Sequence, residues 1–95
     1  MAGYIIAEVQ INDAEAYERY KAAVPATIAA YGGKFLVRGG RLETLEGDWE
    51  PNRIVVLEFE SAEQAKAWWS SQEYAAPKQL RQSASLTKMI VVEGI

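Results

Sequence analysis

The order of hydrophobic periodicities along the chain restricts its fold more than any other feature of the sequence. Every second residue is apolar over 4–11, as in a strand with one buried face, and apolar residues then recur at spacings of three and four over 17–31, as on one face of a helix. The same succession returns in the second half of the chain. The sequence predicts, in order, strand Tyr4–Ile11, a helix from Asn12 or Asp13 to Tyr31, a strand from Lys34 to about Arg41, strand Arg53–Glu60, a helix from Ser61 through Trp69, a short helix from Ser71 through Leu80, and strand Lys88–Glu93.

Capping residues and turn formers mark the ends of these segments. Asn12 and Ser61 each precede a glutamate or glutamine by three residues, a spacing typical of a helix N-terminus. Gly39 and Gly40 predict a β-bulge near the end of the second strand. Pro25 cannot donate a backbone hydrogen bond, and its ring clashes with the carbonyl four residues earlier. We therefore expect the first helix to kink or to divide into two shorter helices.

The order strand, helix, strand, strand, helix, strand favours one architecture. With right-handed crossovers and a hairpin between the second and third strands, it packs as a ferredoxin-like βαββαβ sandwich, a four-stranded antiparallel sheet with helices on one face. Ninety-five residues are enough for one hydrophobic core and too few for two. The sequence thus predicts a single α+β domain over residues 1–95.

The predicted sheet has an open face that no helix covers. If Ile5 and Leu57 point toward the helices, strand alternation sends their neighbours to this open face. These neighbours are Tyr4, Ile6, Glu8, Ile54, Val56 and Glu58, with Leu36, Arg38, Ile90 and Val92 as further candidates. Such a face is too apolar to leave in water, and a second copy of the sheet over it would form a barrel with a small enclosed cavity. The pattern therefore favours a homodimer.

The composition excludes several kinds of chemistry. The chain has no histidine and no cysteine, so Ser-His-Asp catalysis, proximal-histidine haem, thiolate chemistry and the common zinc and iron sites cannot operate, and we expect no metal and no cofactor. A net charge of −3 with scattered basic residues argues against a nucleic-acid partner. We find neither a signal peptide nor an apolar run of about 18 residues. A cytoplasmic protein without membrane contact is expected.

Long stretches of the chain resemble a known family. They are YIIAEVQINDAEAYERYKAAVPATIAAYGGKFLVRGG, LEGDWEPNRIVVLEFES, and AKAWWSSQEYAAPKQLRQSAS followed by VVEG. In order and spacing they resemble the small bacterial proteins of domain of unknown function family 1330, within the dimeric α+β barrel superfamily. The resemblance implies a ferredoxin-like protomer and a homodimer whose sheets face one another. It implies no reaction, because other branches of that superfamily include cofactor-free monooxygenases, muconolactone isomerases and haem enzymes.

Two glutamates of the open face are the candidates for acid–base chemistry. Glu58 and Glu8 would lie in an apolar cavity, where burial can suit a carboxylate to proton transfer. Arg38 could hold a substrate carboxylate through paired N–H groups. The structural alternative is that Arg38 forms an ion pair with one of the two glutamates at the subunit boundary.

Aromatic residues are the candidates for a ligand-binding wall. Together, Trp49, Trp68, Trp69 and Tyr74 could form a wall for a flat ligand, because pockets are mostly apolar. Tyr20 could reach the pocket mouth with its hydroxyl group, although its spacing also fits core packing. Trp68 and its neighbour Trp69 lie about 100° apart on a helix, so one should be in the core and the other at an interface or pocket rim.

Three hypotheses for the function follow from these residues. The leading one is a homodimeric barrel that binds a small organic molecule through Arg38, Glu8, Glu58 and an aromatic rim. The alternative is a cofactor-free monooxygenase or isomerase, in which a carboxylate moves a proton and Arg38 stabilises developing negative charge. The third is a structural or interaction module whose cavity is filled by its own side chains.

Overall fold

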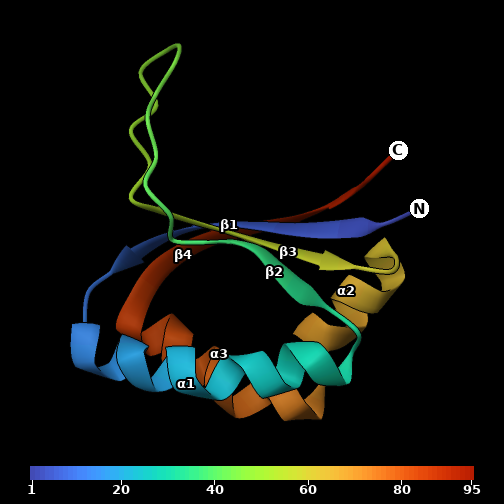
Figure 1. The fold of residues 1–95 in the computed structure, drawn as a ribbon. Coiled ribbons are helices and arrows are strands. Elements are labelled where there is room, and N and C mark those ends of the chain that lie inside the picture. The colour runs from blue at the N-terminus through green and yellow to red at the C-terminus, as the bar shows by residue number, and fades with distance from the viewer.

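The chain folds into two layers, a sheet and a layer of helices that covers one of its faces (Figure 1). The computed structural model describes residues 1–95. Its elements are β1 (Gly3–Ile11), α1 (Ala14–Ala30), β2 (Lys34–Arg38), β3 (Arg53–Phe59), α2 (Ala62–Trp69), α3 (Gln72–Ala84) and β4 (Ser85–Glu93). This order confirms the predicted ferredoxin-like α+β architecture. None of the helices combines the length and the apolar character needed to cross a membrane.

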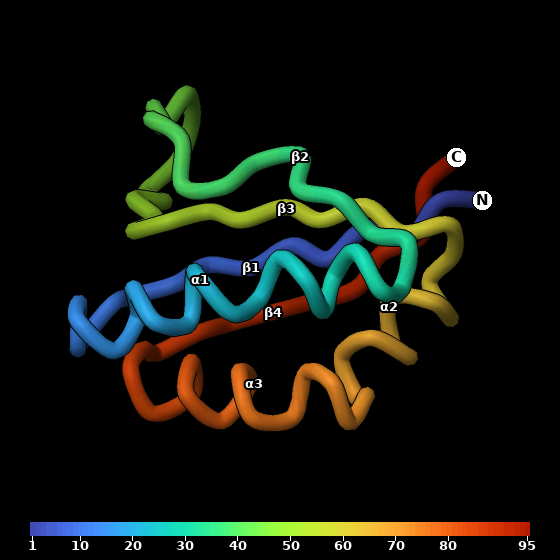
Figure 2. Tube along the Cα trace, turned by 60° about the horizontal axis from the view of Figure 1, so that its bottom comes forward, coloured from blue at the N-terminus to red at the C-terminus, as the bar shows by residue number.

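The central strand β1 organises the sheet. It pairs with β3 on one side and with β4 on the other, which gives the antiparallel order β2-β3-β1-β4 with β2 and β4 at the edges (Figure 2). The pairing with β4 extends from Gly3 opposite Glu93 to Ile11 opposite Ser85. β4 therefore begins earlier than the predicted start at Lys88, because the whole length of β1 finds backbone partners on it.

α1 runs without a break through Pro25. The predicted division into two shorter helices is wrong. Pro25 has no N–H for the carbonyl of Lys21, four residues earlier, so this carbonyl lacks its usual partner within the helix. The Arg38 guanidinium replaces that partner, because its Nη2 donates a hydrogen bond of 2.7 Å to the Lys21 carbonyl oxygen.

A bulge in β2 moves the side chains after it to the opposite faces of the sheet. The register against β3 shifts between Phe35 and Val37, so that Val37 pairs with Val56 and Arg38 with Val55. The bulge predicted at Gly39 and Gly40 is therefore misplaced: it lies earlier, within β2. A one-residue shift exchanges the two faces of a strand. Arg38 consequently lies on the helix side of the sheet, and its predicted place on the open face is wrong.

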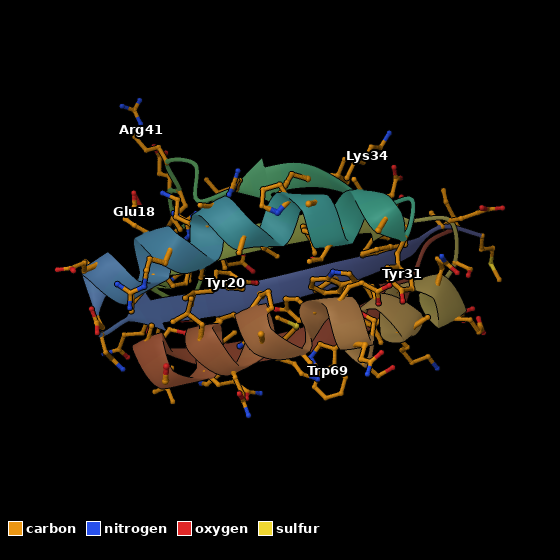
Figure 3. The ribbon with its side chains drawn as sticks, turned by 90° about the horizontal axis from the view of Figure 1, so that it is seen from below. Glu18, Tyr20, Tyr31, Lys34, Arg41 and Trp69 are labelled. Carbon is orange, nitrogen blue, oxygen red and sulfur yellow. The ribbon has the colours of Figure 1, made fainter.

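The core between the sheet and the helices is built around two large aromatic rings. Trp68 of α2 and Tyr74 of α3 are fully buried and stack with ring centroids 4.0 Å apart. Phe59 of β3 packs 5.6 Å from Trp68 and ties these helices to the sheet. Trp69 is 43% exposed, as expected for the neighbour of a core residue on a helix. Figure 3 shows Tyr20 between α1 and α3, whereas Trp69 lies at the lateral edge of the helix layer, on the side away from α1.

Gly3 lies where the start of α2 meets β1, and this contact can be tested. A Cβ at Gly3 would collide with the backbone of Ser61 and Ala62. Gly3→Ala should therefore lower the free energy of unfolding by about 1–3 kcal/mol, the usual cost of overpacking, as measured by urea denaturation. Gly40→Ala is the matched control, since a Cβ there meets no atom within 4 Å. Equal stability of the two variants would contradict the close packing at Gly3.

Candidate functional site

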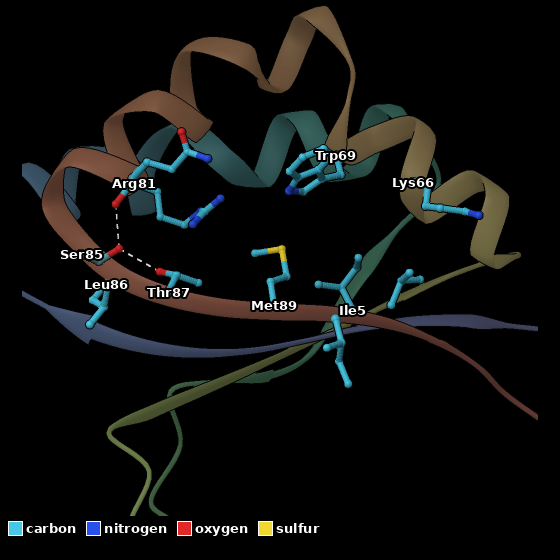
Figure 4. Close-up of a pocket in the computed structure, with 11 residues that line it drawn as sticks. Ile5, Lys66, Trp69, Arg81, Ser85, Leu86, Thr87 and Met89 are labelled. Atoms are coloured by element: carbon cyan, nitrogen blue, oxygen red, sulfur yellow. Dashed lines mark hydrogen bonds between the residues drawn. The ribbon is translucent and has the colours of Figure 1, made fainter.

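An open hollow lies between edge strand β4 and helices α2 and α3 (Figure 4). We call it the β4 hollow. Its volume is about 500 Å³, which is within the usual range for small-molecule sites. Its walls combine apolar, hydroxyl and basic side chains, and none of the lining residues is acidic. Among them are Lys66, Trp69, Arg81, Thr87 and Met89.

Arg81 is the charged group at the inner wall of the β4 hollow. It is only 5% exposed, and its guanidinium points into the hollow in Figure 4. Nε donates a hydrogen bond of 3.1 Å to the Tyr74 hydroxyl oxygen. The two terminal nitrogens donate no hydrogen bond within the chain, and no carboxylate forms a salt bridge with Arg81. A buried cation without a counter-ion is costly, so this arrangement favours an anion in the hollow.

Two buried tyrosines, linked by a hydrogen bond, position Arg81 from the core side of its guanidinium. The hydroxyl oxygens of Tyr74 and Tyr20 are 2.8 Å apart, and both residues are buried. Burial, followed by the neighbouring Tyr74, raises the pKa of the Tyr20 hydroxyl far above its ordinary value of 10.0. The Tyr20 hydroxyl group therefore stays protonated at neutral pH. The chain of hydrogen bonds fixes the guanidinium plane and leaves the terminal nitrogens free to donate outward.

A second, narrower space lies beneath α1, against the helix side of the sheet. This inner cavity has a volume of about 30 Å³, room for one or two water molecules but not for an organic ligand. Ile5, Arg81 and Met89 line both the inner cavity and the β4 hollow. Arg81 thus forms part of the wall between an open site and the core.

The structure does not bring Arg38 together with Glu58 and Glu8. Glu58, on the open face, accepts a hydrogen bond of 3.1 Å from the Tyr4 hydroxyl and forms a salt bridge of 3.2 Å with Lys34. The hydrogen bond to Glu58 also raises the pKa of the Tyr4 hydroxyl. Arg38 lies on the other side of the sheet and forms no ion pair with either glutamate within the chain. The predicted pairing at a subunit boundary stays a prediction.

The remaining predicted residues lie in three separate places. Glu8 lines a shallow hollow of about 90 Å³ on the open face, opposite Lys88 in the sheet. Trp49 is 62% exposed in the loop between β2 and β3, where it lines a different hollow of about 400 Å³. Trp68 and Tyr74 are in the core. No continuous aromatic wall of these three residues forms.

Sequence reasoning missed Arg81, although a signal for it exists. Arg81 follows Tyr74 by seven residues, which is close to two helical turns, so the two side chains share one face of α3. A cation on the face of a helix that carries a core aromatic residue is unusual, since arginine is rarely buried without a partner. Helical spacing alone would have singled it out.

Comparison with known proteins identifies the family of the chain. The sequence profile described as Domain of unknown function (DUF1330) matches residues 2–95. The chain belongs to this family. The match confirms the resemblance seen in the sequence, and no curated protein matches this DUF1330 member.

Solved structures similar to this DUF1330 member share its fold. A protein of unknown function from Rhodopseudomonas palustris is 19% identical at a TM-score of 0.79, and the match covers 99% of this chain and 82% of that one. SnoaB, a cofactor-independent oxygenase from Streptomyces nogalater, is 10% identical at 0.66, covering 99% and 93%. A dimeric ferredoxin-like protein of unknown function from Bacteroides fragilis is 14% identical at 0.62, covering 98% and 96%.

The hydrogen bonds behind Arg81 predict unequal effects of two similar substitutions. Tyr74→Phe leaves both the Arg81 Nε and the Tyr20 hydroxyl without a partner, and should lower the free energy of unfolding by about 1–3 kcal/mol. Tyr20→Phe keeps the bond between Tyr74 and Arg81, so it should cost roughly 0.5–1.5 kcal/mol. Urea denaturation measures both. A larger loss for Tyr20→Phe would contradict the central place of Tyr74.

The raised pKa of Tyr20 predicts a loss of stability in alkali. Above its ordinary value of 10.0 the unfolded chain loses this proton while the folded chain keeps it. The unfolded state then binds fewer protons, so the free energy of unfolding falls by up to about 1.4 kcal/mol per pH unit, and the full contribution is present below that pH. Denaturation at about pH 9 and pH 11 should show a smaller decline in Tyr20→Phe than in the wild type. Parallel declines would contradict the assignment.

Proposed function

We propose that this domain binds a small organic anion in the β4 hollow, with Arg81 as its anchor. The observation that carries the proposal is a buried guanidinium that has no counter-ion, while its terminal nitrogens face a hollow of about 500 Å³. A carboxylate is the simplest matching group, because the flat fork of arginine pairs with two oxygens at once. Tyr74 and Tyr20 act as positioning residues that hold this fork in place.

The walls of the β4 hollow suggest the rest of the ligand. Trp69 offers an indole surface and Met89 a polarisable thioether, both suited to a flat apolar body. Lys66 adds a second cation to the lining. The expected ligand is therefore an aromatic or unsaturated carboxylic acid rather than a neutral or cationic molecule.

We also propose that the domain is a homodimer whose open sheet faces pack together. Ile90 is 59% exposed on this face, and Val37, Leu86 and Val92 are exposed large apolar residues as well. A domain of this size gains stability by covering such a face. The similarity in fold to a dimeric protein from Bacteroides fragilis supports the proposal. A cytoplasmic location and the absence of a nucleic-acid partner stay predictions from the sequence.

A cofactor-free monooxygenase or isomerase remains the second candidate. Its support is the fold shared with SnoaB, a cofactor-independent oxygenase. Glu58 is a poor acid–base group for it, since Lys34 and Tyr4 already occupy its oxygens. Glu8 has access to a shallow hollow on the open face, so a role in proton transfer would require the dimer interface to enclose it. The third hypothesis, a structural module, requires that the β4 hollow takes no ligand.

Binding of aromatic carboxylates tests the leading proposal. Naphthoate should quench tryptophan fluorescence in a saturable way, whereas naphthamide, its neutral counterpart, should bind more weakly. Arg81→Gln should weaken naphthoate binding about 10- to 100-fold, the effect of losing charge-assisted hydrogen bonds. Arg81→Lys should retain part of the affinity, and Arg19→Gln, which changes an exposed arginine of α1, should bind as the wild type does. Equal affinity for acid and amide would contradict the proposal.

Native mass spectrometry of two lysine variants tests the proposed homodimer. Ile90→Lys places a charge on the open face, on edge strand β4, and should shift the protein to monomer at micromolar concentration, because an unpaired buried charge is costly. Ile11→Lys is the control. Ile11 is also exposed, but strand alternation places it on the helix side at the end of β1. A monomeric wild type, or a dimer of Ile90→Lys, would contradict the proposed interface.

A further inference from the structure

A second group of cations lies on the far side of the inner cavity from the β4 hollow. Lys21 of α1, Arg38 of β2 and Arg53 of β3 all line this cavity, and its lining includes no acidic residue. We call these three residues the α1–β2 cluster. Neither Arg38 nor Arg53 forms a salt bridge, and Lys21 pairs only with the exposed Glu18, at 3.0 Å. The local charge is therefore positive in a protein whose net charge is −3.

The position of Arg53 is fixed by the residues around it. Its guanidinium carbon lies 5.6 Å from the centroid of the Tyr17 ring, and its Nε is a buried polar atom without a hydrogen-bond partner. A Cβ at Gly39 would collide with the Arg53 guanidinium. Gly39 also has a φ of 69°, a conformation that glycine takes without strain. Because Gly39 has no Cβ, the Arg53 guanidinium can occupy this space.

The Arg38 guanidinium is also oriented, by two contacts. It lies 4.4 Å above the Phe35 ring, and Nη2 donates to the Lys21 carbonyl, the acceptor that Pro25 leaves free. A guanidinium has five N–H donors, and this contact uses one of them. Two oriented guanidinium groups and one lysine therefore line the same cavity, and most of the guanidinium donors are unused. This is the arrangement with which proteins bind planar or tetrahedral oxyanions.

We infer that Lys21, Arg38 and Arg53 form a second anion site, which binds one carboxylate or phosphate group at the surface between α1 and the β2 edge of the sheet, outside the inner cavity that is too small to hold it. The site does not depend on the proposed function, because Arg81 takes no part in it. The bond between Arg38 and the Lys21 carbonyl helps to orient the cluster, and the remaining donors of Arg38 and Arg53 contact the anion.

Titration of ¹⁵N-labelled protein with inorganic phosphate and, separately, with acetate tests the inference at constant ionic strength. The amide signals of Gly39 and Arg53 should shift in a saturable way with at least one of the two anions. Saturation by phosphate alone assigns the site to phosphoryl groups, and saturation by acetate assigns it to carboxylates. If neither anion produces saturable shifts, the inference is wrong.

Five substitutions separate this site from the β4 hollow and from general charge effects. Arg53→Gln and Arg38→Gln should each weaken binding about tenfold, the effect of one charge-assisted hydrogen bond. Lys21→Gln should weaken it less, and it provides a surface variant that keeps the test valid if either arginine variant fails to fold. Arg19→Gln, also on α1, and Arg81→Gln should leave binding unchanged. Loss of the shifts in Arg81→Gln alone would place the anion in the β4 hollow and overturn the inference.

Discussion

The stacking of Trp68 on Tyr74 is the contact on which the helix layer depends. The rings belong to α2 and α3, and each has a polar group that reaches α1: the Trp68 indole nitrogen donates to the Thr27 hydroxyl at 3.0 Å, and the Tyr74 hydroxyl pairs with Tyr20. Phe59 adds the sheet to the same cluster. Three helices and a central part of the sheet are thus joined through two side chains. Because large aromatic residues contribute most of the buried apolar area in a core this small, their packing sets the spacing of the two layers.

Polar groups inside the helix layer are arranged around this aromatic cluster. The burial of Arg81 is tolerated because its Nε donates a hydrogen bond to Tyr74. Arg53 is accommodated because its guanidinium lies over the Tyr17 ring and against Gly39. Neither guanidinium has a carboxylate partner, although acidic residues outnumber basic ones in the chain. The glutamates are instead on the open face, on the helix surfaces, in the loop between β2 and β3, and at strand ends. This separation of charge makes the space between helices and sheet electropositive, which is the physical basis for both proposed anion sites.

Strands with long, regular alternation could be predicted from the sequence, and so could the helix starts. The face assignments in β1 and β3 hold because Ile5, Ala7 and Leu57 are buried as the period of two requires. The bulge in β2 could not be found, because nothing distinguishes Leu36 from an ordinary strand residue. That single irregularity moved Arg38 from the predicted cavity to the other side of the sheet. The continuity of α1 through Pro25 could not be predicted either, because the hydrogen-bond partner of the Lys21 carbonyl is Arg38, which belongs to β2.

The bulge also makes the two edges of the sheet unequal. β2 has five residues, loses its regular register at Leu36 and begins with a lysine, all of which make it a poor template for another strand. β4 has nine residues and pairs with β1 from end to end, so its outer backbone groups form a long regular row. Unwanted edge-to-edge growth into larger aggregates is therefore blocked on one side of the molecule only. On the other side, the consecutive polar residues Thr87 and Lys88, one on each face of β4, are the protection that the sequence provides against it.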